Sequence, residues 1–179
     1  MKEKIREIKR RFFAMRNGII ADNYRRAGAP YKIVFGLTLP QIVEIAATLS
    51  PDADVARWLR DNTTTRESVL LAPMLYPREK MTPAEAAEWI ESSPTVEAID
   101  ILCHRLLRHV PEAVDIALAA AGSPRDLTRY AALRLLMNLF PASADTLEPL
   151  AREELKRECA LTRPLALMAI DEIDFFRTA

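Results

Sequence analysis

The segment from Thr95 to Phe140 constrains the fold more than any other part of this chain. Its apolar residues recur at helical spacing, and the pattern is interrupted twice, at Pro111 and at Gly122-Ser123-Pro124. The first pattern holds a stripe spaced i, i+3, i+4, i+7 and i+8, which consists of Ile99, Leu102, Cys103, Leu106 and Leu107. Helices that pair and restart after a proline predict an α-solenoid.

The same rhythm continues on both sides of this segment, from Thr38 to Phe176. Signals that open a helix, in which Ser, Thr or Pro precedes an apolar stripe, fall near residues 38, 64, 94 and 124. Steps of about 26 to 30 residues are shorter than the roughly 40-residue HEAT repeat but fit a compact helix–turn–helix repeat. The predicted fold class is therefore all-α, a right-handed α-α superhelix of about five HEAT-like or armadillo-like helix pairs. Pro73 lies inside one predicted helix and is expected to kink or split it.

The 179 residues are predicted to form one domain, 1–179, with N-terminal helices and a connector over 1–37 and stacked helix pairs over 38–176. The connector, Tyr31–Leu37, has the composition of a strand but no obvious partner strand. We expect it to be extended and to bury Ile33 and Phe35.

Composition excludes several classes of protein. No apolar run approaches the roughly 18 residues that a membrane span needs, and the charged N-terminal residues lack the apolar core of a secretory signal. Cys103 and Cys159 fall in predicted helices, which favours buried thiols over a disulfide and the cytoplasm as the compartment. There is no glycine-rich phosphate loop and no zinc-ligand spacing, so neither a cofactor nor a metal is expected. His104 and His109 are five residues apart and do not share a helix face.

Charge is distributed unevenly although the formal net charge is zero. Residues 1–32 hold ten Lys or Arg against three acidic residues, so they carry +7 and the rest of the chain carries −7. A basic segment of this kind can meet phosphate groups, but a solvated helix face is an equally good interpretation.

Asp100 is the carboxylate whose position most invites a functional interpretation. It lies on a mostly apolar helix, where a charge is costly unless it is paired, and His104 is its i+4 neighbour. One interpretation is a structural ion pair, and the other is a carboxylate in a groove beside phosphate-binding cations. Among Trp58, Trp89, Tyr76 and Tyr130, we expect Tyr130 to be the residue suited to stack against a base, with Arg129 beside it and Arg125 and Arg134 nearby.

Four segments, in this order and spacing, resemble the bacterial DNA alkylation repair proteins built from HEAT-like repeats, the AlkD-like glycosylases. They are FGLTLPQIVEIA, TTTRESVLLAPMLY, VEAIDILCHRLL and RYAALRLLMNLF, within roughly residues 30–175. The resemblance implies a DNA-facing concave surface and excision of N3- or N7-alkylated purines. It places the family's catalytic aspartate at Asp100 and its arginine at Arg129 or Tyr130. Its two tryptophans fall on Val96 and Met168 and therefore depart from the pattern.

Two functions remain open from the sequence. In the first, the protein binds duplex DNA and acts in alkylation repair, and Asp100 supports cleavage of the N-glycosidic bond electrostatically. The DNA contacts would then come from Arg105, Arg108, Arg125, Arg129, Tyr130 and Arg163. In the second, the protein is a catalytically inactive HEAT-like scaffold for a protein partner, which the zero net charge and the missing tryptophans favour.

Overall fold

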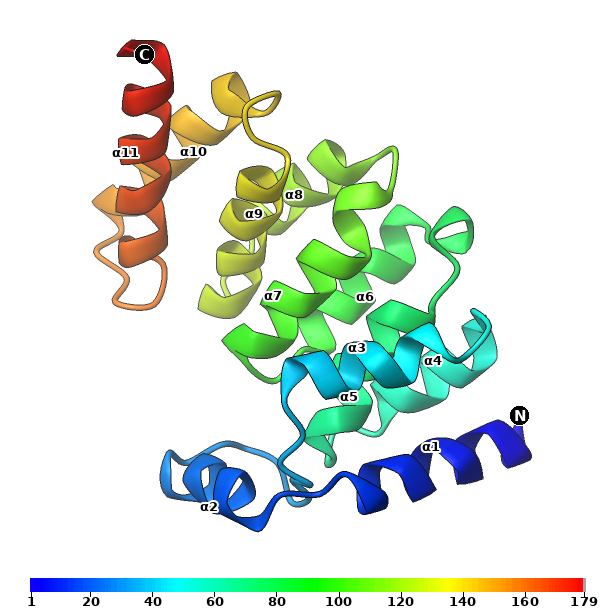
Figure 1. Cartoon of the computed structure of the whole chain (residues 1–179). Coiled ribbons are helices and arrows are strands. Elements are labelled where there is room, and N and C mark those ends of the chain that lie inside the picture. The colour runs from blue at the N-terminus through cyan, green and yellow to red at the C-terminus, as the bar shows by residue number, and fades with distance from the viewer. Residues whose placement is uncertain (179) are drawn as a thin grey trace. The chain divides into compact units, whose positions relative to one another are not determined.

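A computed structural model describes residues 1–178 of the chain, and helices dominate it (Figure 1). Within these residues the predicted all-α, HEAT-like fold class is confirmed, and the only β-type pairing is an isolated bridge between Ile33 and Thr65. The α-helices are α1 (Lys2–Ala14), α2 (Gly18–Arg26), α3 (Leu39–Ala47), α4 (Ala53–Asp61), α5 (Arg66–Leu75), α6 (Pro83–Ser92), α7 (Val96–Arg105), α8 (Ala113–Ala121), α9 (Asp126–Asn138), α10 (Ala144–Lys156) and α11 (Arg163–Thr178). Short 3-10 turns cover Arg78–Lys80 and Leu107–His109.

The chain forms two compact units, which we describe separately. Unit 1 comprises Met1–Met81 and Ser93–Ala98, and unit 2 comprises Thr82–Ser92 and the described chain from Ile99 onward. The single domain predicted from the sequence stays a prediction. No helix within residues 1–178 is both long enough and apolar enough to cross a membrane.

Helix starts follow the capping signals in the sequence. The Thr38 amide donates to the Gln41 side chain at 2.8 Å, and the Glu85 amide donates to the Thr82 hydroxyl at 3.2 Å. A kink or a split is predicted at Pro73; the split is wrong, because α5 continues to Leu75, and the kink stays a prediction. Proline so close to the end of a helix removes only one of its last hydrogen bonds, which explains why the helix continues.

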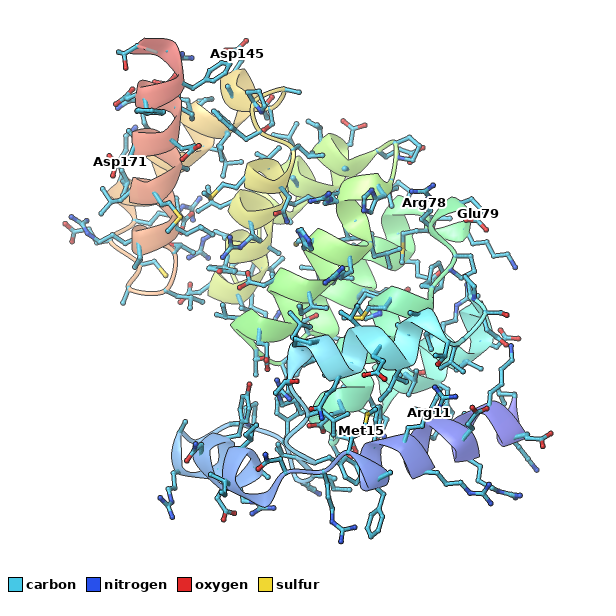
Figure 2. The ribbon with its side chains drawn as sticks, in the orientation of Figure 1. Arg11, Met15, Arg78, Glu79, Asp145 and Asp171 are labelled. Carbon is cyan, nitrogen blue, oxygen red and sulfur yellow. The ribbon has the colours of Figure 1, made fainter. Side chains whose placement is uncertain are left out.

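Helices α4 and α5 pair in the core of unit 1, and α1 adds its apolar face of Ile5, Ile8 and Phe12. On the same helix Arg11 donates to the Thr48 hydroxyl and to Glu7, so it joins α1 to the end of α3 (Figure 2). These contacts hold the basic N-terminal helix against the repeat helices of its own unit.

The connector between α2 and α3 is bound through its backbone as well as through its buried side chains. The Glu67 carboxylate, fully buried at the start of α5, accepts the amides of Phe35, Gly36 and Leu37 at 3.1, 2.9 and 3.3 Å. Arg66 is also buried, and it donates to the Leu37 carbonyl at 2.9 Å and to Glu97 at 2.8 and 2.5 Å. We call this arrangement of Glu67 and Arg66 around the connector the connector lock.

The prediction that the connector buries Ile33 and Phe35 is wrong. Ile33 is 47% exposed and Phe35 is half-buried, while Tyr31, Val34 and Leu37 are the buried residues. The reason is the bridge to α5, in which the Ile33 amide donates to the Thr64 carbonyl and the Arg66 amide donates to the Ile33 carbonyl. Tyr31, Val34 and Leu37 are three positions apart, which fits an extended segment with three residues per turn rather than the two-residue alternation of a strand.

Unit 2 is built from two helix pairs, α8 with α9 and α10 with α11, and α9 contacts helices of both pairs. Its core holds Ala131, Leu133, Leu135 and Leu136 of α9, all fully buried. Because α9 is buried around most of its circumference, its polar residues must find partners within the protein or reach solvent at an edge.

Candidate nucleic-acid interface

Asp100 lies on α7 and is held by two residues of α9. Its Oδ1 accepts the Tyr130 hydroxyl at 3.0 Å and the Arg134 Nε at 2.7 Å. Within the described residues its Oδ2 accepts a single bond, from the Arg134 Nη2 at a long 3.4 Å. The side chains of Asp100 and Arg134 remain 34% and 28% exposed. The carboxylate is therefore oriented through Oδ1, while Oδ2 keeps capacity to interact with a ligand.

Arg134 belongs to this site although it is not among the DNA contacts predicted from the sequence. The expected i, i+4 partner of Asp100, His104, instead lies 3.2 Å from the Arg108 guanidinium. The one sequence signal for Arg134 is its place one turn after Tyr130, whose hydroxyl it contacts at 3.0 Å. Burial works against the charge of Arg134, but its bonds to Tyr130 and Asp100 outweigh this and raise its pKa. Arg134 is thus a fixed, permanent cation at the surface of unit 2.

Two further arginines, Arg105 at the end of α7 and Arg108 just beyond it, lie close enough to His104 for their charges to act on it, as the charge of Arg134 also does. Arg105 is exposed and Arg108 is half-buried. Burial and the neighbouring charges of Arg108 and Arg105 lower the pKa of His104, so this histidine is neutral at pH 7 and adds no charge. We call Asp100, Arg105, Arg108, Tyr130 and Arg134 the α7–α9 cluster, in which three arginines outweigh one aspartate.

Tyr130, which the sequence suggests could stack against a base, is instead buried. The residue is only 6% exposed, and burial raises the pKa of its hydroxyl. The phenol therefore stays protonated at neutral pH and donates to Asp100. This geometry supports a role in orienting the carboxylate and leaves little ring surface for a base.

The other predicted DNA contacts are not gathered at this cluster. Arg129 is buried and donates to Glu154 at 3.0 Å, to Asp126 at 2.7 Å and to two backbone carbonyls. A phosphate would have to displace one of these partners to reach the Arg129 guanidinium, so Arg129 is not part of the interface. Arg125 donates to a backbone carbonyl of α6 at 3.2 Å, and Arg163 is exposed at the start of α11.

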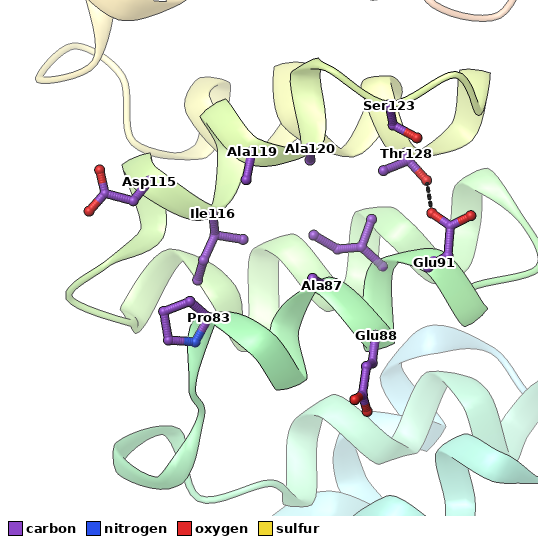
Figure 3. A pocket seen from close by; sticks show the side chains of 11 residues that line it. Pro83, Ala87, Glu88, Glu91, Asp115, Ile116, Ala119, Ala120, Ser123 and Thr128 are labelled. Atoms are coloured by element: carbon purple, nitrogen blue, oxygen red, sulfur yellow. Dashed lines mark hydrogen bonds between the residues drawn. The ribbon is translucent and has the colours of Figure 1, made fainter.

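A cavity between α6 and α8 of unit 2 is unsuitable for phosphates. It has a volume of about 460 Å³, and its apolar lining includes Ile90 and Ile116 (Figure 3). The charged residues that line it are acidic, namely Glu88, Glu91 and Asp115. Glu91 is held by the Thr128 hydroxyl at 2.7 Å. Negative charge here would repel a nucleic-acid backbone.

Cysteine and metal chemistry find little support in this unit. Burial raises the pKa of the Cys103 thiol, which is fully buried, so it stays protonated and unreactive. Cys159 is half-buried, and both cysteines are free. Among residues 1–178 no three His, Cys, Asp or Glu side chains gather closely enough to hold a metal ion.

A second basic surface lies in unit 1. Most cations of α1 and α2 are exposed, among them Lys2, Arg6, Arg10 and Arg26. Others are neutralised locally, as Lys4 is by Asp52 at 2.8 Å. The net charge of residues 1–32 is therefore presented largely to solvent, as expected for a surface that meets an anion.

Comparison with known proteins adds the fold context. No protein-family model and no curated protein sequence matches the chain. One solved structure superposes with a TM-score of 0.76, covering 90% of this chain and 72% of that one at 16% identity. That protein is described as belonging to a family related to the HEAT-like repeat DNA glycosylases, with affinity for branched DNA structures.

The chain has a HEAT-like repeat fold. At 16% identity the likeness concerns the fold alone, and it agrees with the family resemblance seen in the sequence. Function must therefore be argued from the residues of the two units.

Proposed function

We propose that this HEAT-like repeat protein binds DNA, and that the α7–α9 cluster contributes phosphate contacts. The observation that carries the proposal is the orientation of Arg134. Asp100 and Tyr130 engage its Nε and Nη2, and none of the hydrogen bonds found in residues 1–178 uses its Nη1. A guanidinium held on one edge and open on the other is well prepared to bind a phosphate oxygen.

The strength of binding follows from the number of phosphates that the protein neutralises. The three arginines in the α7–α9 cluster and the exposed cations of unit 1 release counterions when they bind phosphates. The arginines of the cluster are suited to the sugar–phosphate backbone, because a guanidinium forms paired hydrogen bonds with phosphate oxygens. We therefore expect sequence-independent binding with a Kd of roughly 10⁻⁴–10⁻⁶ M at physiological salt.

Neutralising the cluster is expected to flatten the salt dependence of DNA binding. In the triple variant Arg105→Gln, Arg108→Gln, Arg134→Gln, the slope of log K against log salt should become shallower by roughly 0.9 for each phosphate that is no longer neutralised, so by about 2–3. Fluorescence anisotropy of a labelled duplex, titrated between about 50 and 200 mM salt, measures this slope. Replacing Arg6, Arg10 and Arg26 by glutamine tests the unit 1 surface in the same way.

A matched control comes from α10, where Arg152 and Lys156 already pair with Glu148 and Glu153. Removing these two charges should leave the slope unchanged. If no variant alters the slope, or if the protein ignores duplex DNA at low salt, the DNA proposal fails and a HEAT-like scaffold for a protein partner replaces it.

Base excision is the second candidate function, and the open Oδ2 of Asp100 favours it. A carboxylate beside the sugar stabilises the positive charge that develops when an N-glycosidic bond breaks. An alkylated purine is already cationic and leaves readily, so a proton donor is not essential. The positive charge of Arg134 offsets part of this stabilisation. Excision therefore asks more of the site than DNA binding does.

Asp100→Asn is expected to abolish release of 7-methylguanine from methylated DNA while leaving duplex affinity nearly unchanged. Because the Asp100–Arg134 pair is partly exposed, the stability cost should stay near or below about 1 kcal/mol. Product release is measured by chromatography and stability by thermal unfolding. Asp115→Asn, which changes an exposed acid on α8, is the control and should keep full activity. Wild-type protein that releases no alkylated base removes the excision proposal and leaves the binding proposal standing.

A further inference from the structure

A second cavity, in unit 1, combines aromatic walls with cations. It has a volume of about 430 Å³ and lies where α1, the connector, α4 and the start of α5 meet. Its lining includes Lys9, Phe13, Ile33, Phe35, Trp58 and Asn62. The volume is within the range of pockets that enclose small planar ligands. We call this cavity the Trp58 pocket.

The apolar part of the pocket is unusually exposed for side chains of this size. Phe13 is 60% exposed and Ile33 is 47% exposed, and Trp58 is half-buried. Beneath them Phe12 is buried and packs on Phe35 with ring centroids 5.7 Å apart. Aromatic side chains left open to solvent over a packed aromatic floor offer a stacking surface.

Cations lie directly over these rings. The Lys9 ammonium is 4.9 Å from the centroid of the Trp58 ring, and the Arg16 guanidinium is 3.8 Å from that of Phe13. Lys32 is exposed in the adjoining connector. Among the described residues, none of those that line the pocket is acidic. The aromatic lining favours a planar, apolar group inside the pocket. The cations favour an anionic group of the same ligand at the rim.

We propose that the Trp58 pocket binds an unpaired nucleobase of DNA, with Lys9, Arg16 and Lys32 meeting the adjacent phosphates. A base in the duplex stack cannot enter, because both of its faces are covered by neighbouring base pairs. A base from a bulge, a fork or a single-stranded end can stack on the exposed rings of the pocket. The Asn62 amide also lines the pocket; it donates to the Ser68 hydroxyl at 3.1 Å and accepts from the Thr64 hydroxyl at 3.0 Å, which leaves one N–H for the edge of the base. This inference rests on the proposed DNA binding and specifies which DNA structure is preferred.

The test compares a labelled duplex with the same duplex that carries one unpaired thymine. Stacking of one base on an aromatic side chain typically contributes about 1–3 kcal/mol, so wild-type protein should bind the bulged duplex roughly 5- to 150-fold more tightly. Trp58→Ala should bring this ratio close to one and leave affinity for the intact duplex within about twofold. Trp58→Phe should restore most of the preference.

A second variant of the pocket and one control outside it complete the test. Phe13→Ala removes an exposed ring with little effect on folding, and it should also reduce the preference. Phe175→Ala removes a comparably exposed ring from unit 2 and should not. Thermal unfolding of each variant confirms that it folds.

Each result is decisive for one proposal. An intact preference in both Trp58→Ala and Phe13→Ala overturns the pocket proposal, as does wild-type protein that binds both duplexes equally. In those cases DNA binding itself survives. Failure to bind either duplex at low salt instead overturns DNA binding together with the pocket, and a protein partner becomes the better occupant.

Discussion

Replacing Glu67 by alanine is expected to destabilise the protein by about 3–5 kcal/mol, the cost typical of breaking a buried charge network. The Glu67 carboxylate is fully buried and accepts three consecutive backbone amides as well as the Arg66 guanidinium at 3.3 Å. Alanine would leave these amides without their acceptor at a largely buried site. Each unsatisfied buried donor costs on the order of 1–3 kcal/mol.

Urea unfolding followed by circular dichroism measures this loss. Glu67→Gln keeps one carbonyl oxygen in place and should lose less stability than Glu67→Ala. Glu44→Ala, which removes an exposed acid from α3, should stay within about 0.5 kcal/mol of wild type. A cost below about 1 kcal/mol for Glu67→Ala would contradict the role assigned to the connector lock.

A methyl group at Gly36 is expected to be still less tolerable. Gly36 has a φ of +81°, and a Cβ there would lie 2.1 Å from the Asn17 carbonyl oxygen and 2.8 Å from the Ala21 nitrogen. Both neighbours are backbone atoms at the start of α2 and cannot rotate away. Gly36→Ala should therefore cost at least about 4 kcal/mol, which is exceptional for a single substitution, and should yield little folded protein.

Gly28 provides the matched control because it shares the backbone conformation but has open space around it. Its φ is +75°, and a Cβ there would meet nothing within 4 Å. Gly28→Ala should cost only the conformational penalty of about 1–2 kcal/mol. Equal destabilisation of the two variants, measured by the same urea titrations, would show that steric overlap at Gly36 is not the cause.

Local signals in the sequence are enough to predict the helices. Caps such as Thr38 and Thr82, prolines and apolar stripes act within one or two turns, so all the residues involved are neighbours in the sequence. The extended connector is predictable for the same reason. Its inward face is not, because that face depends on the pairing of Ile33 with Thr65, more than thirty residues away.

The contacts of the candidate site also join residues that are far apart in the sequence, so local signals do not predict them. The sequence singles out Asp100 because a carboxylate on an apolar stripe needs a partner, but its partner on α9 lies 34 positions later. Nothing in the sequence near Arg129 indicates that Glu154 of α10 encloses it. Helix packing decides which of several arginines faces solvent. The spacing of residues within a single helix does not predict how that helix packs against others.

The way the connector is bound has a consequence for how this protein can change. Glu67 binds backbone amides, which every residue except proline possesses, so the lock is indifferent to most side chains that it holds. Gly36 is the position at which identity is fixed by geometry. Ile33, which lines the Trp58 pocket and is 47% exposed, is therefore free to be replaced. A new side chain at this position would alter what the pocket accepts while the connector lock keeps the surrounding helices of unit 1 in place.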